Sequence, residues 1–99
     1  MTVVMVTTRK GGTPEAMIAA TKKLKAAAEK NGAERVLLSQ VVIGPDVGHW
    51  VIRIVCPDMA SFGKVVDAAT SDPAALEALA AVNAISEITS RRMLTGFDL

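Results

Sequence analysis

The sequence predicts an α+β fold with the element order β-α-β-β-α-β, in which a four-stranded antiparallel sheet carries its helices on one face. Three observations predict this fold. Short β-branched segments alternate with two long, alanine-rich segments of helical period. The breaks between them hold residues that favour turns and helix ends. The length of 99 residues suffices for one domain, so we expect a single domain over residues 1–99.

The first strand and the first helix are indicated by residue type and by their end signals. Residues Val3–Arg9 are largely β-branched and are followed by two glycines, as at the end of a strand. Thr13 can cap a helix, Pro14 suits its first position, and Gly32 ends it. The residues that recur at helical spacing on the predicted inner face are Met17, Ala20, Leu24 and Ala27 or Ala28.

The next two strands are predicted to form a hairpin. Residues Arg35–Ile43 and His49–Cys56 are rich in aliphatic side chains, as strands are. Between them, Gly44–Gly48 consists of the usual turn-forming residues.

A second helical region follows, and we expect it to be broken in two. Asp58 can cap its first part, and Ser71–Pro73 ends this part and starts the next, with Asp72 as the new cap. The last strand is predicted at Ile85–Thr95, which completes the ferredoxin-like, split-βαβ order. The predicted inner faces consist of Met59, Phe62, Val66 and Ala69 in the first part, and of Leu76, Leu79 and Val82 or Ala80 in the second.

The second and third strands do not alternate apolar and polar residues cleanly. VLLSQVVI (Val36–Ile43) and WVIRIV (Trp50–Val55) are apolar at both odd and even positions. A sheet with one solvated face should alternate. The helices can cover one face, and 99 residues leave nothing to cover the other. We therefore expect a homodimer formed through the sheet face.

Composition excludes several classes of function. The net charge of +1 gives no attraction to nucleic acid or to an anionic membrane, and RNA binding on the sheet would need stacking aromatics, which are scarce. No apolar run reaches the ~20 residues of a membrane helix. One cysteine allows no internal disulfide and favours a cytoplasmic location. No spacing typical of a metal site occurs.

The topology, the length, the segment WVIRIVCPDMASFGK (Trp50–Lys64) and the helix SDPAALEAL (Ser71–Leu79) together resemble the dimeric α/β-barrel superfamily. The chain is most similar to its small antibiotic-biosynthesis-monooxygenase and NIPSNAP-like branches. The resemblance implies two ferredoxin-like subunits that pair their sheets into a barrel, with pockets for small organic ligands. It also implies that no cofactor is needed, as in the cofactor-free oxygenases of the superfamily. Haem degradation is disfavoured, because the first strand offers Thr7 and Thr8 in place of an Asn and no predicted helix contains a His.

Rare residues gather in the stretch Gly44–Lys64. His49 is a candidate general base, because the unperturbed pKa of a histidine lies near neutrality, although a solvated histidine beside a loop is ordinary. Arg53 lies between isoleucines in a strand. It could anchor a carboxylate or phenolate ligand, or pair with a carboxylate such as that of Glu87, because a buried charge needs a partner.

A ligand pocket is predicted between sheet and helices, because alanine-rich helices leave space and aromatic residues to fill it are few. Trp50 shares a strand face with apolar residues and either fills the core or lines this pocket. Ser39 and Gln40 interrupt an apolar strand. Their polar side chains could hydrogen-bond a ligand, or they could set the register of the strand. Cys56 is expected to be a small hydrophobic residue. The residues predicted to bind the ligand are Met17, Ser39, Trp50, Phe62 and Leu79.

Two classes of function therefore remain. In the first, the protein is a homodimer that binds a small, largely apolar organic molecule and acts on it as a cofactor-free monooxygenase or isomerase, with His49 or Arg53 as catalytic candidates. In the second, it is a ligand-binding, structural or regulatory dimer without turnover. The fold alone does not separate these classes, because function depends on the site.

Overall fold

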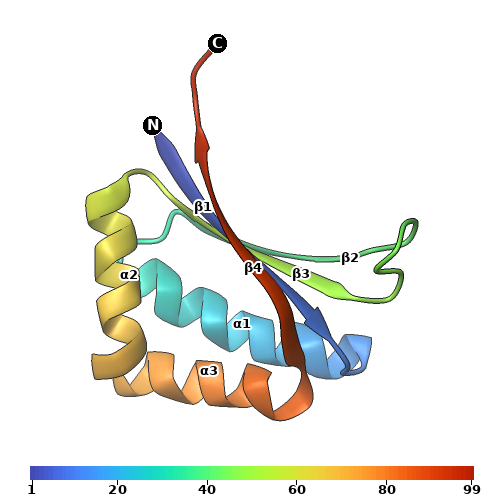
Figure 1. The fold of residues 1–99 in the computed structure, drawn as a ribbon. Coiled ribbons are helices and arrows are strands. Elements are labelled where there is room, and N and C mark those ends of the chain that lie inside the picture. The colour runs from blue at the N-terminus through green and yellow to red at the C-terminus, as the bar shows by residue number, and fades with distance from the viewer.

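A computed structural model describes residues 1–99 and has the predicted element order. The four strands form one sheet in the order β2-β3-β1-β4, and all neighbouring strands are antiparallel. The helices lie together on one side of this sheet (Figure 1). The ferredoxin-like α+β fold is thus confirmed. The elements are β1 (Thr2–Lys10), α1 (Pro14–Lys30), β2 (Arg35–Gln40), β3 (Trp50–Cys56), α2 (Met59–Ser71), α3 (Pro73–Ile85) and β4 (Glu87–Gly96).

The bounds of several elements differ from the prediction. Strand β2 ends at Gln40 and β3 begins at Trp50, so the connecting loop is longer than expected. Gly44 and Gly48 adopt positive φ angles in this loop, which turn the chain out of the sheet before the strands can extend further. Helix α3 continues to Ile85, and β4 begins only at Glu87. No helix is both long enough and apolar enough to cross a membrane.

The predicted caps begin all three helices. The Thr13 side chain accepts a hydrogen bond from the backbone N–H of Ala16 at the start of α1. Asp58 does the same for α2, at 2.8 Å from the N–H of Ser61. Asp72 caps the start of α3 and is also the residue that ends α2. The two helices therefore meet at a corner without a connecting loop (Figure 1).

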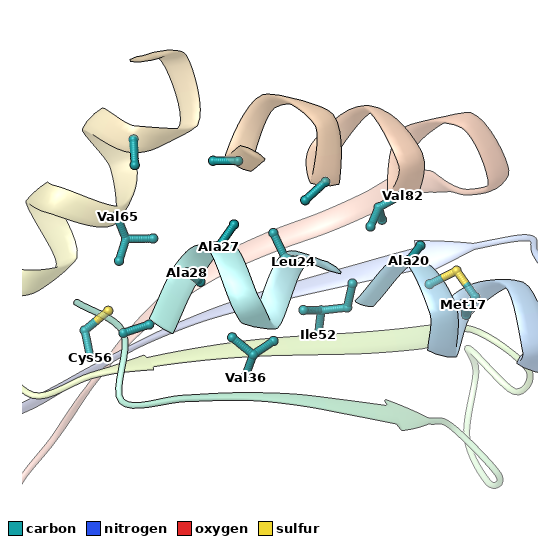
Figure 2. Close-up of a cluster of buried hydrophobic side chains, with 14 of the residues drawn as sticks. Met17, Ala20, Leu24, Ala27, Ala28, Val36, Ile52, Cys56, Val65 and Val82 are labelled. Carbon is teal, nitrogen blue, oxygen red and sulfur yellow. The ribbon is translucent and has the colours of Figure 1, made fainter. Parts of the chain in front are cut away.

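The core lies between the sheet and the helices. All five residues predicted for the inner face of α1 are buried, so that prediction is confirmed. Figure 2 shows Leu24 and Ala27 of α1 beside α3, with Ile52 of β3 and Val36 of β2 on the sheet side. The lysines of α1 are exposed, so this helix has one apolar face and one charged face.

The predicted inner faces of α2 and α3 are partly wrong. Met59, Val66 and Leu76 are about half exposed. Val82 is buried as predicted, and Phe62 and Leu79 pack against the core. The other residues that α2 and α3 bury are Val65, Ala68, Ala75 and Ala78, and the alternative Ala80 is exposed. The physical reason is that α3 is apolar nearly all round, so its periodicity does not distinguish one face from another. Small alanine side chains face inward on both helices.

Candidate functional site

A cavity of about 200 Å³ lies between the sheet and all three helices. Eleven of its 13 lining residues are hydrophobic. The floor includes Met5 of β1 and Ile54 of β3, and the helices contribute Leu24, Val65 and Leu79 among others. Cavities of this composition are the usual sites for small organic ligands.

The cavity exists because the helices face it with small side chains. Ala27 and Ala28 of α1, Ala68 and Ala69 of α2, and Ala75 of α3 all line it. Side chains this short cannot span the gap between the helices and the sheet, and no aromatic residue reaches into it. The space that the alanine-rich helices predict is therefore present.

Two polar residues, Asn31 and Arg91, line this cavity. The Asn31 side-chain nitrogen donates to the Ala27 carbonyl oxygen and to the Asp72 carboxylate, both at 2.8 Å. These bonds hold the amide and leave its Oδ1 atom without a donor from the chain. Arg91 of β4 makes no ion pair and no side-chain hydrogen bond. Both groups are therefore available to a ligand in the cavity.

A second inward-facing arginine lies opposite Trp50, towards the other end of β3, and does not line the cavity. Arg9 of β1 is only 4% exposed, and its Nη1 atom donates to Asn83 Oδ1 at 2.9 Å and to Ser86 Oγ at 3.3 Å. No carboxylate pairs with it, and its Nε atom has no acceptor. Burial lowers the pKa of Arg9, and the nearby charge of Arg91 lowers it further. Of the two arginines, only Arg91 lines the cavity, and no carboxylate pairs with it.

The structure places the predicted ligand-binding residues at several different locations. Leu79 lines the cavity. Met17 and Trp50 are buried in the core at the other end of β3, where they fill the space completely. Phe62 packs against the core but does not line the cavity, and Ser39 lies on the sheet face opposite the helices. The ligand-binding roles of these four residues stay predictions. The cavity lies beside Ile54, whereas the sequence indicated a position beside Trp50.

The two catalytic candidates lie outside the cavity as well. His49 is in the β2–β3 loop, with its Nδ1 atom 3.6 Å from Asp46 Oδ1. Arg53 of β3 is exposed on the sheet face away from the helices. The catalytic roles of both residues stay predictions.

The expected pairing of Arg53 with Glu87 is wrong within the chain. Arg53 lies opposite Val6, whereas Glu87 lies opposite Lys10. Four residues of β1 separate these positions, a distance of about 13 Å along a strand. Arg53 is exposed and has no carboxylate partner in its own chain.

Cys56 is fully buried, as predicted for a small hydrophobic residue. Burial raises the pKa of its thiol, and the charge of Asp58 raises it further. The thiol therefore stays protonated near neutral pH and is not a nucleophile. No three histidine, cysteine or carboxylate side chains lie close enough together to hold a metal ion.

Sequence reasoning missed the two polar residues that line the cavity, and also the buried Arg9. Asn31 precedes the helix-ending Gly32, so its residue type indicates only a helix end. Arg9 shares the face of Val3 and Met5 by simple alternation along β1, so its inward position could have been predicted. The position of Arg91 could not, because β4 carries two adjacent arginines and a bulge opposite Thr8 and Arg9 shifts its register.

Comparison with solved structures supports the fold. The chain superimposes on a mutant of SnoaB, a cofactor-independent oxygenase from Streptomyces nogalater, with a TM-score of 0.76 and 18% identity, over 99% of this chain and 95% of SnoaB. A candidate antibiotic biosynthesis monooxygenase from Chloroflexus aurantiacus gives a TM-score of 0.68 and 16% identity, over 99% and 95% of the two chains.

A NIPSNAP family protein of unknown function from Agrobacterium tumefaciens gives a TM-score of 0.68 and 11% identity, over 94% of this chain and 86% of that protein. No family model and no curated protein matches the sequence. The likeness to antibiotic-biosynthesis-monooxygenase-like and NIPSNAP structures is thus confirmed at the level of the fold.

Proposed function

We propose that this protein is a homodimeric, cofactor-independent monooxygenase that binds a small, largely apolar molecule with an acidic hydroxyl group. The observation that carries this proposal is the apolar cavity with Arg91 and Asn31 in its lining. A largely apolar lining with two polar groups suits a ring system with one polar substituent. The shared fold with a cofactor-independent oxygenase supports the type of reaction.

The size of the cavity limits the ligand. At about 200 Å³ it is smaller than the ~300–1,000 Å³ that is usual for ligand pockets. A molecule of one or two fused rings fits this volume, and a larger polycyclic molecule would need α2 or α3 to move. The inward alanines of these helices are the positions where a small change in sequence would change the accepted size.

The cavity lining contains no histidine or carboxylate that could act as a base. The substrate must therefore be acidic enough to lose its hydroxyl proton to water. The charge of Arg91 favours the deprotonated form, because nearby positive charge stabilises an anion. Asn31 can orient the substrate, since its Oδ1 atom accepts hydrogen bonds.

An electron-rich anion of this kind can react with dioxygen without a cofactor. One oxygen atom enters the substrate and the other leaves as water with two substrate hydrogens, so that RH₂ and O₂ give RO and H₂O. The substrate itself is the reductant. The chain's residues bind the substrate, favour its anion and exclude bulk water.

The homodimer is supported by the sheet face opposite the helices, which carries several aliphatic side chains and which no element of the chain covers. We expect an interface larger than the ~1,000 Å² of a minimal biological contact. Light scattering after size exclusion tests it, and a monomer at micromolar concentration would contradict it. A cytoplasmic location belongs to the same proposal and is supported by the single unpaired cysteine.

Binding and turnover of 1-naphthol, compared with neutral 1-methylnaphthalene, test the proposal. We expect 1-naphthol to raise the melting temperature and to be consumed with oxygen. Arg91→Met should weaken 1-naphthol binding about tenfold, the effect of ~1.4 kcal/mol, and leave 1-methylnaphthalene binding unchanged. Ala69→Leu should block both probes by filling the cavity, whereas Ala80→Leu on the exposed side of α3 should block neither.

The same experiment separates the alternatives. Binding of 1-naphthol without oxygen uptake would favour the non-catalytic ligand-binding protein or the isomerase. Loss of oxygen uptake in His49→Gln or Arg53→Gln with retained binding would assign chemistry to those predicted residues. If neither probe binds, or if Ala69→Leu binds as the wild type does, the cavity is not the site.

A further inference from the structure

The sheet face opposite the helices, called the open face here, carries an arginine pair at its centre. The strand register places Arg53 of β3 and Arg92 of β4 on either side of Val6 in the central strand β1. Val6 is only 5% exposed although no element covers this face. The neighbours that can shield it are the aliphatic stems of the two arginines, which lie along apolar surface while their charged ends reach solvent.

No carboxylate in the chain neutralises this pair. The ion pairs of the protein are Lys25–Glu29 and Lys30–Asp72, and neither lies on the open face between these strands. Glu87 is the single acidic residue within the strands, and it lies opposite Lys10 at the far end of β1. Arg35 of β2 adds a third positive charge to the open face.

Sheet-to-sheet pairing would bring two such arginine pairs together. Packed sheets lie about 10 Å apart, so four guanidinium groups would face one another across the interface. Their mutual repulsion and the loss of their hydration oppose association, and the effect is large when charges are buried without partners. The aliphatic side chains of the open face favour pairing, while its arginines oppose it.

We propose that a polyvalent oxyanion binds between the two open faces and is held by Arg53 and Arg92 of both copies. The guanidinium group donates two parallel hydrogen bonds, which match the oxygens of a phosphate or a carboxylate. The adjacent row of the open face supplies hydroxyl groups from Thr8 and Ser90, which lie opposite each other. This site is separate from the cavity beneath the helices. The oxyanion site rests on the homodimer that we propose above, and it does not depend on the ligand proposed for the cavity.

The dimer dissociation constant, measured by sedimentation equilibrium, tests the site. Sodium chloride, phosphate and citrate are compared at equal ionic strength, so that general screening is the same in each. We expect phosphate or citrate to tighten the dimer at least tenfold relative to chloride. A larger effect of phosphate would indicate a tetrahedral oxyanion, and a larger effect of citrate would indicate a polycarboxylate.

Two variants locate the effect. Arg53→Gln/Arg92→Gln should remove the dependence on phosphate and citrate and should dimerise in chloride alone, because the repulsion is gone. Arg91→Gln is the matched control, since Arg91 is adjacent to Arg92 but faces the helices, and it should keep the dependence.

Several results would overturn the proposal. Equal dissociation constants in all three salts would overturn the oxyanion site while leaving the dimer intact. So would an undiminished phosphate or citrate effect in the double variant. A monomer in every salt would overturn both the dimer and this site, whereas binding of 1-naphthol in the cavity is measured independently of either.

Discussion

The two faces of the sheet are built from the same four strands, but only one of them is complete within the chain. On the helix side, Val3 and Cys56 are fully buried and the side chains join a continuous core. On the open face, Arg53 and Arg92 are exposed, and β4 has no buried residue on either side. Apolar residues at both odd and even positions therefore indicate apolar side chains on both faces. They do not indicate that the two faces are equally apolar.

The difference also separates two kinds of polar group. Arg9 on the helix side is held by Asn83 and Ser86 in a fixed position, whereas the open-face arginines have no partner within the chain. The charge of Arg9 is therefore fixed within the core. The effect of the unpaired charges on the open face depends instead on which molecule binds there.

The largest expected effect compares two adjacent valines that point to opposite faces of β1. Val3→Ala removes buried methyl groups and should lower the free energy of unfolding by about 2–4 kcal/mol. Val4→Ala, at low protein concentration, should lower it by less than about 1 kcal/mol, because Val4 is half-buried. Chemical denaturation measures both.

Protein concentration sharpens this comparison. If a second copy covers the open face, the effect of Val4→Ala should grow as concentration rises, because dimerisation stabilises the folded state. The effect of Val3→Ala should not change. Equal effects of the two variants at all concentrations would contradict the distinction between a complete face and an incomplete one.

The next effect concerns the acceptors of Arg9. Asn83→Ala should lower the free energy of unfolding by about 1–3 kcal/mol, because a buried guanidinium loses its acceptor. Arg9→Met should be close to neutral, since a buried charge without a counter-ion adds little stability. In the double variant, Asn83→Ala should then have almost no further effect. Additive losses would show that the hydrogen bond is not the cause.

A smaller effect should appear in the pH dependence of stability. Hydrogen bonds from Asn31 and from the Ala74 N–H lower the pKa of Asp72, and Lys30 lowers it further. The folded state therefore has the lower pKa, so Asp72 stabilises the fold above the unfolded pKa of ~3.9, and this stabilisation is lost as pH falls through the folded pKa. The melting temperatures of wild type and Asp72→Asn should differ at pH 7, and the difference should shrink as pH falls below ~3.9.

Asp67→Asn is the control for this measurement. The Asp67 carboxylate makes no hydrogen bond within the chain, so its removal should leave the pH dependence unchanged. If Asp72→Asn keeps its full difference from the wild type at pH 3, the ionised carboxylate is not the group responsible.

The smallest effect is expected on the open face. Glu87→Gln should change the free energy of unfolding by less than about 0.5 kcal/mol, because Glu87 is exposed and far from Arg53 along β1. Chemical denaturation of the isolated subunit at low concentration measures it. A loss of more than about 2 kcal/mol would restore the pairing that the sequence suggested.

The sequence predicted the fold because each signal was local. Caps at Thr13, Asp58 and Asp72 define the helix starts, and the alternation of lysine and apolar residues defines the inner face of α1. The inner face of α3 was not predictable, because a helix that is apolar nearly all round has no distinct stripe.

The site was predictable in kind but not in position. Alanine-rich helices indicated a cavity, and one is present. Its location depends on which end of β3 is filled, and Trp50 and Met17 fill the end where the cavity was expected. The inward position of Arg91 depends on a bulge between β1 and β4, and a shift of one residue reverses every side chain of a strand. Such a shift leaves no trace in the pattern of a strand like β4.

The pairing of the first strand with the last also determines when the sheet can be completed. Thr89 donates a hydrogen bond to the carbonyl oxygen of Thr8, 81 residues earlier in the chain. During synthesis, β1 can bond to β3 on one side long before residues 87–96 exist, and its other edge stays open until they do. Contacts between distant residues close slowly, so we expect the docking of β4 to be the late step in folding. Until then, the nascent chain exposes an unpaired edge of its central strand β1, which makes that interval the period of greatest risk of aggregation.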